Sequence, residues 1–238
     1  MRLNRAIVAA VFMGFLVLLS GCFEKHELAP IVDAWYQKGS ASNFYIVRRG
    51  DTIYSIAWAF GLDYRALAFA NNLSAPYALT VGARLKMTHQ RPASESIGYA
   101  PTEQASTPSD TQSLVTSVSR WQWPARGKLI QRYSTNPDGH PGISISGQLG
   151  EWVRAAASGS VVYSSDGVRG YGNLIIIKHN NSYLSAYAFN QQNLVSVGAN
   201  VECGQPIARM GRDDAGLTVL YFEIRKNGKP VDPLQLLN

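Results

Sequence analysis

The sequence predicts a two-domain protein: a small βααβ unit, then an all-β or β-rich unit, joined by a disordered linker. Apolar residues recur at helical spacing within residues 44–87, and short alternating runs punctuated by Gly, Asn and Pro fill residues 121–238. Residues 88–120 are rich in Ser, Thr, Pro and Gln. Such a segment buries too little apolar surface to offset its ordering entropy, and we therefore expect a linker there.

The first 21 residues are expected to be an export signal. Two arginines precede an apolar run over residues 6–19, which is short for a membrane span, and small residues follow. A single short membrane anchor is the alternative. The end of the segment, Leu-Ser-Gly-Cys, resembles the lipobox of bacterial lipoproteins, which implies a signal peptide of residues 1–21 and lipidation of Cys22. Residues 22–43 then form a tether, and Phe23 in place of Asp implies sorting to the outer membrane, facing the periplasm.

The chain has a modest basic surplus, with a formal net charge of +6 and 46% hydrophobic residues. Loss of the signal removes two arginines and no acids, which leaves a net charge of about +4. In an exported protein this surplus suits an anionic envelope better than nucleic acid. If Cys22 is acylated, Cys203 has no disulfide partner; we expect a small buried residue there, with a catalytic thiol as the alternative.

The first half of the unit at residues 44–87 predicts a strand and a helix. Residues 45–48 alternate as a strand does. Asp51 or Thr52 can cap the helix that follows, and Gly61 ends it.

The second half predicts another helix and a return strand. Asp63 caps the helix, which ends at residues 71–72, and the strand is expected over residues 79–87 with a turn at Gly82. This unit resembles a LysM module. The residues that carry the resemblance are Tyr45, Val47, Gly50, Asp51, Thr52, Ile53, Ile56, Ala57, Leu67, Asn71 or Asn72, Leu73, Val81, Gly82 and Leu85.

The resemblance implies binding to the N-acetylglucosamine backbone of peptidoglycan, through the loop after the first strand and the loop after the second helix. Exposed amides and short polar side chains can bond acetamido groups, and Tyr77 can stack on a sugar. The alternatives are that Asp51 and Thr52 only cap a helix and that Tyr77 only packs. The predicted peptidoglycan-binding residues are Gly50, Asp51, Thr52, Ile53, Asn72, Leu73, Ala75 and Tyr77.

The unit at residues 121–238 predicts strands with few helices. Asn180 and Asn181 suit a hairpin turn between strands at residues 174–179 and 183–189. The stretch GLTVLYFEIR, residues 216–225, also alternates, so its side chains fall on two faces. Leu220, Phe222 and Ile224 form an apolar face, and Val219, Tyr221, Glu223 and Arg225 form a mixed one.

This second unit resembles an M23, or LytM, peptidase domain. The resemblance is carried by His140-Pro141-Gly142-Ile143-Ser144-Ile145, by Gly167 to His179, by Tyr187-Ala188-Phe189, by Gly204 to Ala208, by Leu220 to Arg225 and by Val231 to Leu234. Active members show His-x-x-x-Asp, Tyr-x-His and His-x-His. Two of those His residues and the Asp hold zinc, and the other two His residues assist the attacking water.

Compared with this pattern residue by residue, the sequence lacks most of the zinc ligands and catalytic histidines. His140 keeps the first ligand, but Ser144 replaces the Asp, Phe189 replaces one catalytic His, and Val219 and Tyr221 replace the His-x-His pair. Zinc catalysis needs about three protein ligands with deprotonatable donors. We therefore expect no zinc, no other cofactor and no catalytic residue. His179 is expected to be a hydrogen-bonded or exposed residue rather than a ligand.

The same positions predict a groove for a protein partner, with aromatic side chains as anchors. Strand parity places them on one side, although their apolar surface can equally just fill the void left by lost metal chemistry. The predicted partner-binding residues are His140, Ser144, Tyr187, Phe189, Val219 and Tyr221.

The order of lipobox, LysM module and degenerate M23 domain resembles the NlpD-type murein hydrolase activators. Membership implies that the domain does not cut peptidoglycan but activates an N-acetylmuramoyl-L-alanine amidase in cell separation. We hypothesise that the groove captures a regulatory helix of the amidase. A passive tether between outer membrane and wall, and a zinc endopeptidase with atypical ligands, are the alternatives.

Overall fold

The computed structural model describes residues 43–88, 120–135 and 141–238, all of which belong to one compact unit, Ile31–Asn238. The predicted signal peptide, Cys22, the tether up to residue 42, residues 89–119 of the linker and His140 lie outside the described residues. No helix in the described part of the chain has the length and hydropathy of a membrane span.

The first domain has the predicted βααβ order. Strand β1 (Phe44–Ile46) pairs antiparallel with β2 (Arg84–Lys86), and helices α2 (Ile53–Ala59) and α3 (Tyr64–Ala70) lie between them in the chain. Both strands are shorter than the alternation predicted: residues 47–48 lie beyond the end of β1, and within the expected return strand residues 79–83 are irregular with a turn at 81–82.

Hydrogen bonds at the helix ends explain where both helices start. Thr52 caps α2 through a capping box with Ser55, so the cap is Thr52 and not Asp51. Asp63 caps α3 by accepting a hydrogen bond from the backbone N–H of Arg65, as predicted.

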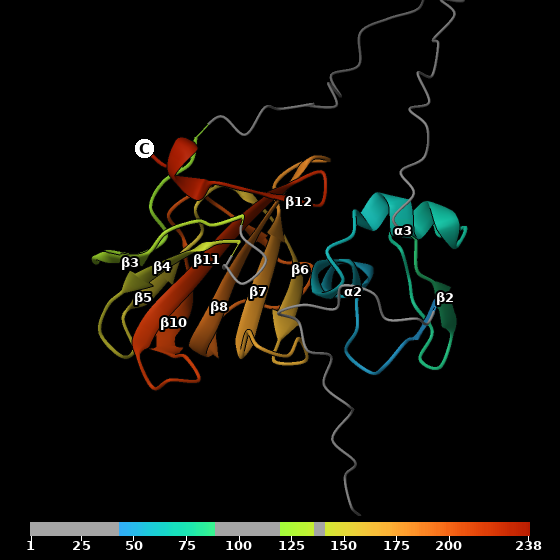
Figure 1. The fold of residues 1–238 in the computed structure, drawn as a ribbon, viewed down its shortest axis with the longest axis horizontal. Helices are drawn as coiled ribbons and strands as arrows, with labels where there is room; N and C mark the ends of the chain where they lie inside the picture. Colours follow the sequence, from blue (N-terminus) through green and yellow to red (C-terminus); the bar gives the residue numbers. More distant parts are fainter. Residues whose placement is uncertain (1–42, 89–119, 136–140) are drawn as a thin grey trace, which may run out of the picture. The chain divides into compact units, whose positions relative to one another are not determined.

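The second domain is built on one ten-stranded antiparallel sheet, with the path β3-β4-β11-β10-β8-β7-β6-β9 and a further pairing of β11 with β8 (Figure 1). A 3-10 helix, η2 (Pro233–Gln235), follows the last strand. The strands are β3 (Leu129–Gln131), β4 (Ile143–Ser146), β5 (Trp152–Arg154), β6 (Gly159–Ser165), β7 (Asn173–Lys178), β8 (Tyr183–Asn193), β9 (Asn200–Val201), β10 (Pro206–Arg212), β11 (Thr218–Lys226) and β12 (Lys229–Val231).

The predicted hairpin between β7 and β8 is confirmed. The side-chain oxygen of Asn180 accepts hydrogen bonds from the backbone N–H groups of Ser182 and Tyr183, both at 2.8 Å. Such a local bond closes the turn, which explains why a polar pair separates two apolar strands here.

Strand β11 gives the sheet two distinct faces, which we call the Phe222 face and the Tyr221 face. Leu220, Phe222 and Ile224 belong to a cluster of buried apolar residues from the second domain alone, and this cluster defines the Phe222 face. Val219 and Tyr221 belong to a second cluster, which also contains side chains of α2 and α3 and defines the Tyr221 face. The predicted alternation of β11 is therefore confirmed, but both faces are buried.

Candidate functional site

The first predicted glycan loop is held by Asp51. Its carboxylate accepts hydrogen bonds from the Tyr45 hydroxyl and from the backbone N–H of Arg48, both at 2.8 Å. Gly50 is exposed with φ of +85°, a conformation that favours glycine. The Asp51 side chain is thus engaged in shaping its own loop, while Gly50 leaves backbone open to solvent.

The second predicted glycan loop lies beside the start of α2. The Tyr77 ring packs edge-on against Tyr54 and Tyr64, with centroids 6.2 and 5.9 Å apart, and Tyr54 directly follows Ile53. Asn72 and Tyr77 both have left-handed backbone, with φ of 53° and 59°. The structure therefore brings together the two loops that the sequence assigned to one site.

The remaining residues of that prediction differ in access to solvent. Ala75 and Asn72 are exposed, and Leu73 packs partly buried against the core. The side chain of Ile53 is only 1% exposed, so only its backbone is available to a ligand. These residues stay predicted glycan contacts.

The positions that replace the zinc ligands and catalytic histidines are adjacent in the sheet. Ser144 on β4 pairs directly with Tyr221 on β11, and Val219 pairs with Ser146 in the same ladder. Ser144 donates to the side-chain oxygen of Gln131 at 3.3 Å. Ser144, Val219 and Tyr221 are 7%, 2% and 1% exposed, so none of these side chains is open to solvent.

The expectation that Tyr187 and Phe189 line one groove is wrong for Tyr187. The register of β8 sets Tyr187 opposite Phe222, and the two rings are 5.2 Å apart on the Phe222 face. Phe189 instead lies 6.4 Å from the ring of Tyr221. Its φ of +61° and the irregular register of β8 break the two-residue alternation, which is the physical reason that parity failed.

A buried polar network that the sequence did not predict as a site lies on the Tyr221 face. Glu223 accepts hydrogen bonds from the Tyr221 hydroxyl at 2.9 Å and from the Tyr171 hydroxyl at 3.5 Å. The Nε of Arg225 donates to the other Glu223 oxygen at 2.6 Å. The alternation of β11 did place Glu223 and Arg225 on the same face as Tyr221, so these two members of the network could have been found from the sequence. No sequence pattern indicated that Tyr171 would join them.

Burial governs the ionisation of this network. Desolvation raises the pKa of Glu223, while the guanidinium of Arg225 and the two phenol donors favour its ionised form. Desolvation and the neighbouring Glu223 charge raise the pKa of Tyr221 far above its usual range. The phenol of Tyr221 therefore stays protonated and donates to Glu223.

These groups do not fit the zinc ion that the M23 family uses. A Ser144 hydroxyl and a protonated phenol replace carboxylate and imidazole, and the phenol already donates to Glu223. Among residues 43–88, 120–135 and 141–238 there is no cluster of three or more His, Cys, Asp or Glu that can hold a metal ion.

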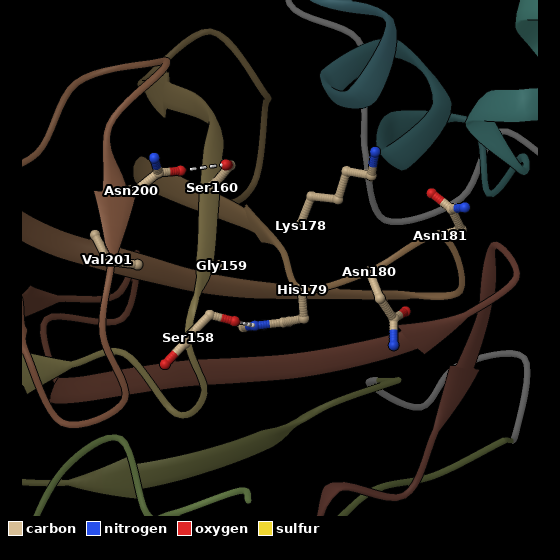
Figure 2. Close-up of a pocket in the computed structure, with 9 residues that line it drawn as sticks. All are labelled: Ser158, Gly159, Ser160, Lys178, His179, Asn180, Asn181, Asn200 and Val201. Carbon is tan, nitrogen blue, oxygen red and sulfur yellow. Dashed lines mark hydrogen bonds between the residues drawn. The ribbon is translucent and has the colours of Figure 1, made fainter. Parts of the chain in front are cut away.

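A shallow surface pocket surrounds His179 at the end of β7 (Figure 2). The Nδ1 of His179 lies 2.8 Å from the Ser158 carbonyl, and Nε2 lies 2.7 Å from the Ser185 hydroxyl. Burial lowers the pKa of His179 to about 4, so the ring is neutral at pH 7. The prediction of a hydrogen-bonded residue is confirmed, because both ring nitrogens have partners.

Cys203 is also held by hydrogen bonds, but it is less buried than predicted. Its thiol lies 3.0 Å from the side-chain amide of Gln122 and 3.4 Å from the Ala156 carbonyl, and the residue is partly exposed. It lies in the turn before β10, away from the Tyr221 face residues, because its contacts are with Gln122, Ala156 and Ser158.

Family models and relatives agree with both domains. The LysM domain model matches residues 45–88, and the model of peptidase family M23 matches residues 138–233. The lipoprotein NlpD/LppB homolog of Pseudomonas aeruginosa is 42% identical over 229 residues, which cover 82% of this chain and 77% of that protein. The chain belongs to the family of NlpD-like lipoproteins.

Two further relatives of this NlpD-like lipoprotein come from Escherichia coli. The murein hydrolase activator NlpD is 37% identical over 84% of this chain and 69% of its own. The lipoprotein YgeR is 40% identical over 99% of this chain and 95% of its own. Among solved structures, the antimicrobial peptidase lysostaphin of Staphylococcus simulans matches 51% of this chain and 54% of its own at 25% identity, with a TM-score of 0.46.

Proposed function

We propose that this NlpD-like lipoprotein is anchored through Cys22 in the outer membrane, faces the periplasm, and binds peptidoglycan through LysM. Its LytM-like domain is catalytically inactive and activates an N-acetylmuramoyl-L-alanine amidase during cell separation. The name of the Escherichia coli relative supports the activator role, and the LysM match supports the peptidoglycan contact. No zinc and no nucleic acid take part.

The chemistry of the Tyr221 face carries the proposal. An M23 peptidase needs proton-transfer groups and metal ligands there, whereas this chain presents the hydroxyl of Ser144, the hydrocarbon side chains of Phe189 and Val219, and a protonated Tyr221. Phe189 and Val219 move no protons. Aromatic and apolar side chains in this position serve a protein contact, with Phe189 and Tyr221 as its anchors.

Dye release from labelled sacculi tests the proposal. The mature chain without its lipid, residues 23–238, is mixed with each amidase of the same cell. We expect at least one amidase to release dye several-fold faster, and the chain alone to release none. Absence of stimulation with every amidase overturns the proposal in favour of a passive tether. Muropeptide cleavage by the chain alone, with one zinc bound per chain, overturns it in favour of an endopeptidase.

A matched pair of substitutions locates the contact. Phe189→Asp puts a charge at a proposed anchor, and Phe69→Asp puts the same charge on a phenylalanine of α3 that is 67% exposed. We expect the first to abolish stimulation and the second to leave it unchanged, with both chains folded by circular dichroism. Equal stimulation by both variants would remove Phe189 from the proposed contact.

A further inference from the structure

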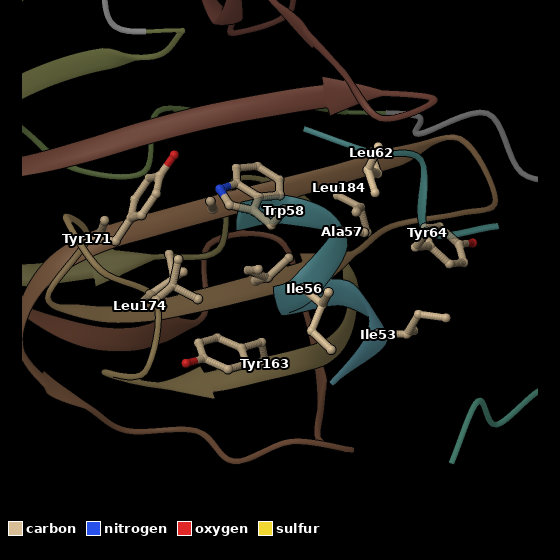
Figure 3. Packing of buried hydrophobic residues seen from close by; sticks show 14 of the residues in the cluster. Ile53, Ile56, Ala57, Trp58, Leu62, Tyr64, Tyr163, Tyr171, Leu174 and Leu184 are labelled. Atoms are coloured by element: carbon tan, nitrogen blue, oxygen red, sulfur yellow. The ribbon is translucent and has the colours of Figure 1, made fainter. Parts of the chain in front are cut away.

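Helix α2 of the LysM module packs on the Tyr221 face of the sheet. Ile53, Ile56 and Trp58 of α2 belong to the same buried cluster as residues of β6, β7, β8 and β11. Figure 3 shows Trp58 turned toward Tyr171 and Ile56 on the side of Tyr163, whereas Ile53 points away from these residues. The partners of α2 in this cluster include Tyr163, Tyr171, Leu174 and Leu184. The module therefore covers the face on which the predicted partner-binding residues lie.

A polar contact fixes the end of α2 on this face. The Nη1 of Arg225 donates to the backbone carbonyl of Trp58 at 2.7 Å, and the guanidinium lies 3.8 Å from the centroid of the indole ring. Arg225 is in turn paired with Glu223, which accepts from Tyr221. An unbroken chain of contacts thus joins Trp58 to Tyr221, one of the two residues that replace the His-x-His pair.

A second contact lies at the turn between β11 and β12. The Nη2 of Arg65 on α3 donates to the side-chain oxygen of Asn227 at 2.8 Å. A Cβ added at Gly228 would come within 2.7 Å of the Asp63 backbone, so the lack of a side chain at this glycine lets the two backbones meet. The positive φ of 76° at Gly228 suits glycine as well.

The covered face is also the face that the proposed activation needs. Phe189 is 9% exposed, and Val219 and Tyr221 are 2% and 1% exposed. Tyr221 is also touched by Tyr171 of its own domain. A partner that packs on this face still has to displace α2 from the cluster that α2 shares with these side chains. The polar part of the contact is one hydrogen bond and one cation–π contact from Arg225, which is itself paired with Glu223 on the same strand. A buried ion pair is a weak source of stability, so this part of the contact suits reversible docking.

We propose that α2 is the built-in occupant of the surface that a partner helix takes, and that the closed chain is inactive until the LysM module moves away. This rests on the proposed function. The fitting partner is a short amphipathic helix that offers Arg225 a large aromatic ring and a terminal backbone carbonyl, as Trp58 does. Partner and α2 exclude each other, and an opened chain activates at lower concentration.

The first experiment opens the contact without touching the Tyr221 face. Gly228→Asn adds a side chain that meets the LysM backbone, and Asn tolerates the left-handed conformation that the turn requires. Gly216→Asn is the matched control, because Gly216 has φ of +80° with nothing within 4 Å of the added Cβ. In the mature chain, Gly228→Asn should raise amidase stimulation at least about five-fold at limiting concentration. Gly216→Asn should not change it.

The second experiment holds the contact shut. Arg65→Cys and Asn227→Cys are combined with Cys203→Ala and joined by a short reducible bis-maleimide, since the two native side chains touch. We expect rapid intramolecular bridging, at least ten-fold lower stimulation in the bridged chain, and full recovery after reduction. Each single-cysteine variant, treated alike, controls for the reagent.

The outcomes separate the two proposals. If the wild type stimulates an amidase, and neither bridging nor Gly228→Asn changes that stimulation, the proposed inactive closed state is wrong. The proposed activator function is then still supported. Failure of the wild type, the reduced chain and Gly228→Asn to stimulate any amidase overturns the activator and the regulation that rests on it. Absence of intramolecular bridging overturns the docked module whatever the amidase does.

Discussion

The Phe222 face and the Tyr221 face belong to the same sheet but are buried by different means. The Phe222 face packs against apolar residues of its own domain, including Ile143, Ile175 and Tyr187. The Tyr221 face carries a buried carboxylate, a guanidinium and two phenols, and its cluster combines apolar residues of its own domain, such as Leu174 and Ile176, with side chains of the LysM module. Apolar packing gives a permanent core, whereas charged groups that depend on a second module give a contact that can open.

The largest effect is expected from Phe222→Ala on the apolar face. Phe222 is fully buried, and loss of its ring leaves a cavity in the core, so the free energy of unfolding should fall by about 3–5 kcal/mol. Urea unfolding followed by circular dichroism measures it. Leu217→Ala, at a side chain that is 56% exposed, should cost under about 0.5 kcal/mol. A loss below about 1 kcal/mol for Phe222→Ala would show that this face is not the core.

Arg225→Ala tests the other face. It leaves the Glu223 carboxylate buried without its cation, so the free energy of unfolding should fall by about 3 kcal/mol. The double variant Glu223→Gln and Arg225→Met removes both charges and should recover most of that loss. If the double variant is as unstable as the single one, the ion pair is not the origin of the cost.

The pH dependence of stability should depend on His179, whose ring packs edge-on against Trp121 of the cluster that defines the Phe222 face. Its pKa is about 4 in the folded chain and about 6.5 unfolded, so the unfolded state takes up the proton first as pH falls. The free energy of unfolding should be constant above pH 6.5 for this group and fall by about 2–3 kcal/mol between pH 6.5 and 4. His179→Asn, which has no proton to take up, should show a smaller decline over this window. The same decline in the free energy of unfolding for the wild type and His179→Asn would contradict the lowered pKa of His179.

The smallest effect is expected in the covering module. Thr52→Ala removes the capping box of α2 and should cost about 1 kcal/mol. Thr80→Ala, at an exposed position, is the control. Because a module that can leave the sheet while folded is stable on its own, the loss should appear in the transition of the LysM module and not in the transition that Phe222→Ala shifts. One transition shared by both domains, shifted as a whole, would mean that the contact does not open.

Much of the fold could be predicted from local patterns. Helical spacing and caps predicted α2 and α3, and the Asn180 turn predicted the β7–β8 hairpin, because both depend on nearby residues. Alternation also predicted which side chains of β11 share a face. Alternation failed at Phe189, because its left-handed backbone puts its side chain on the opposite face of the sheet from Tyr187.

The covering of the Tyr221 face could not be predicted in the same way. Ile53 and Ile56 lie at helical spacing whether they pack on α3 or on a sheet. The pattern therefore does not show which element the apolar face of the helix packs against. The bond from Arg225 to Trp58 joins residues 167 positions apart. Only the tertiary structure brings such groups together.

Helix α2 is seven residues long, about 10 Å from end to end. Its first turn borders the two predicted glycan loops, and its last turn touches Arg225. A chimera with a foreign LysM sequence that lacks Trp58 would keep a LysM module but would lose the contacts that the Trp58 carbonyl and ring make with Arg225.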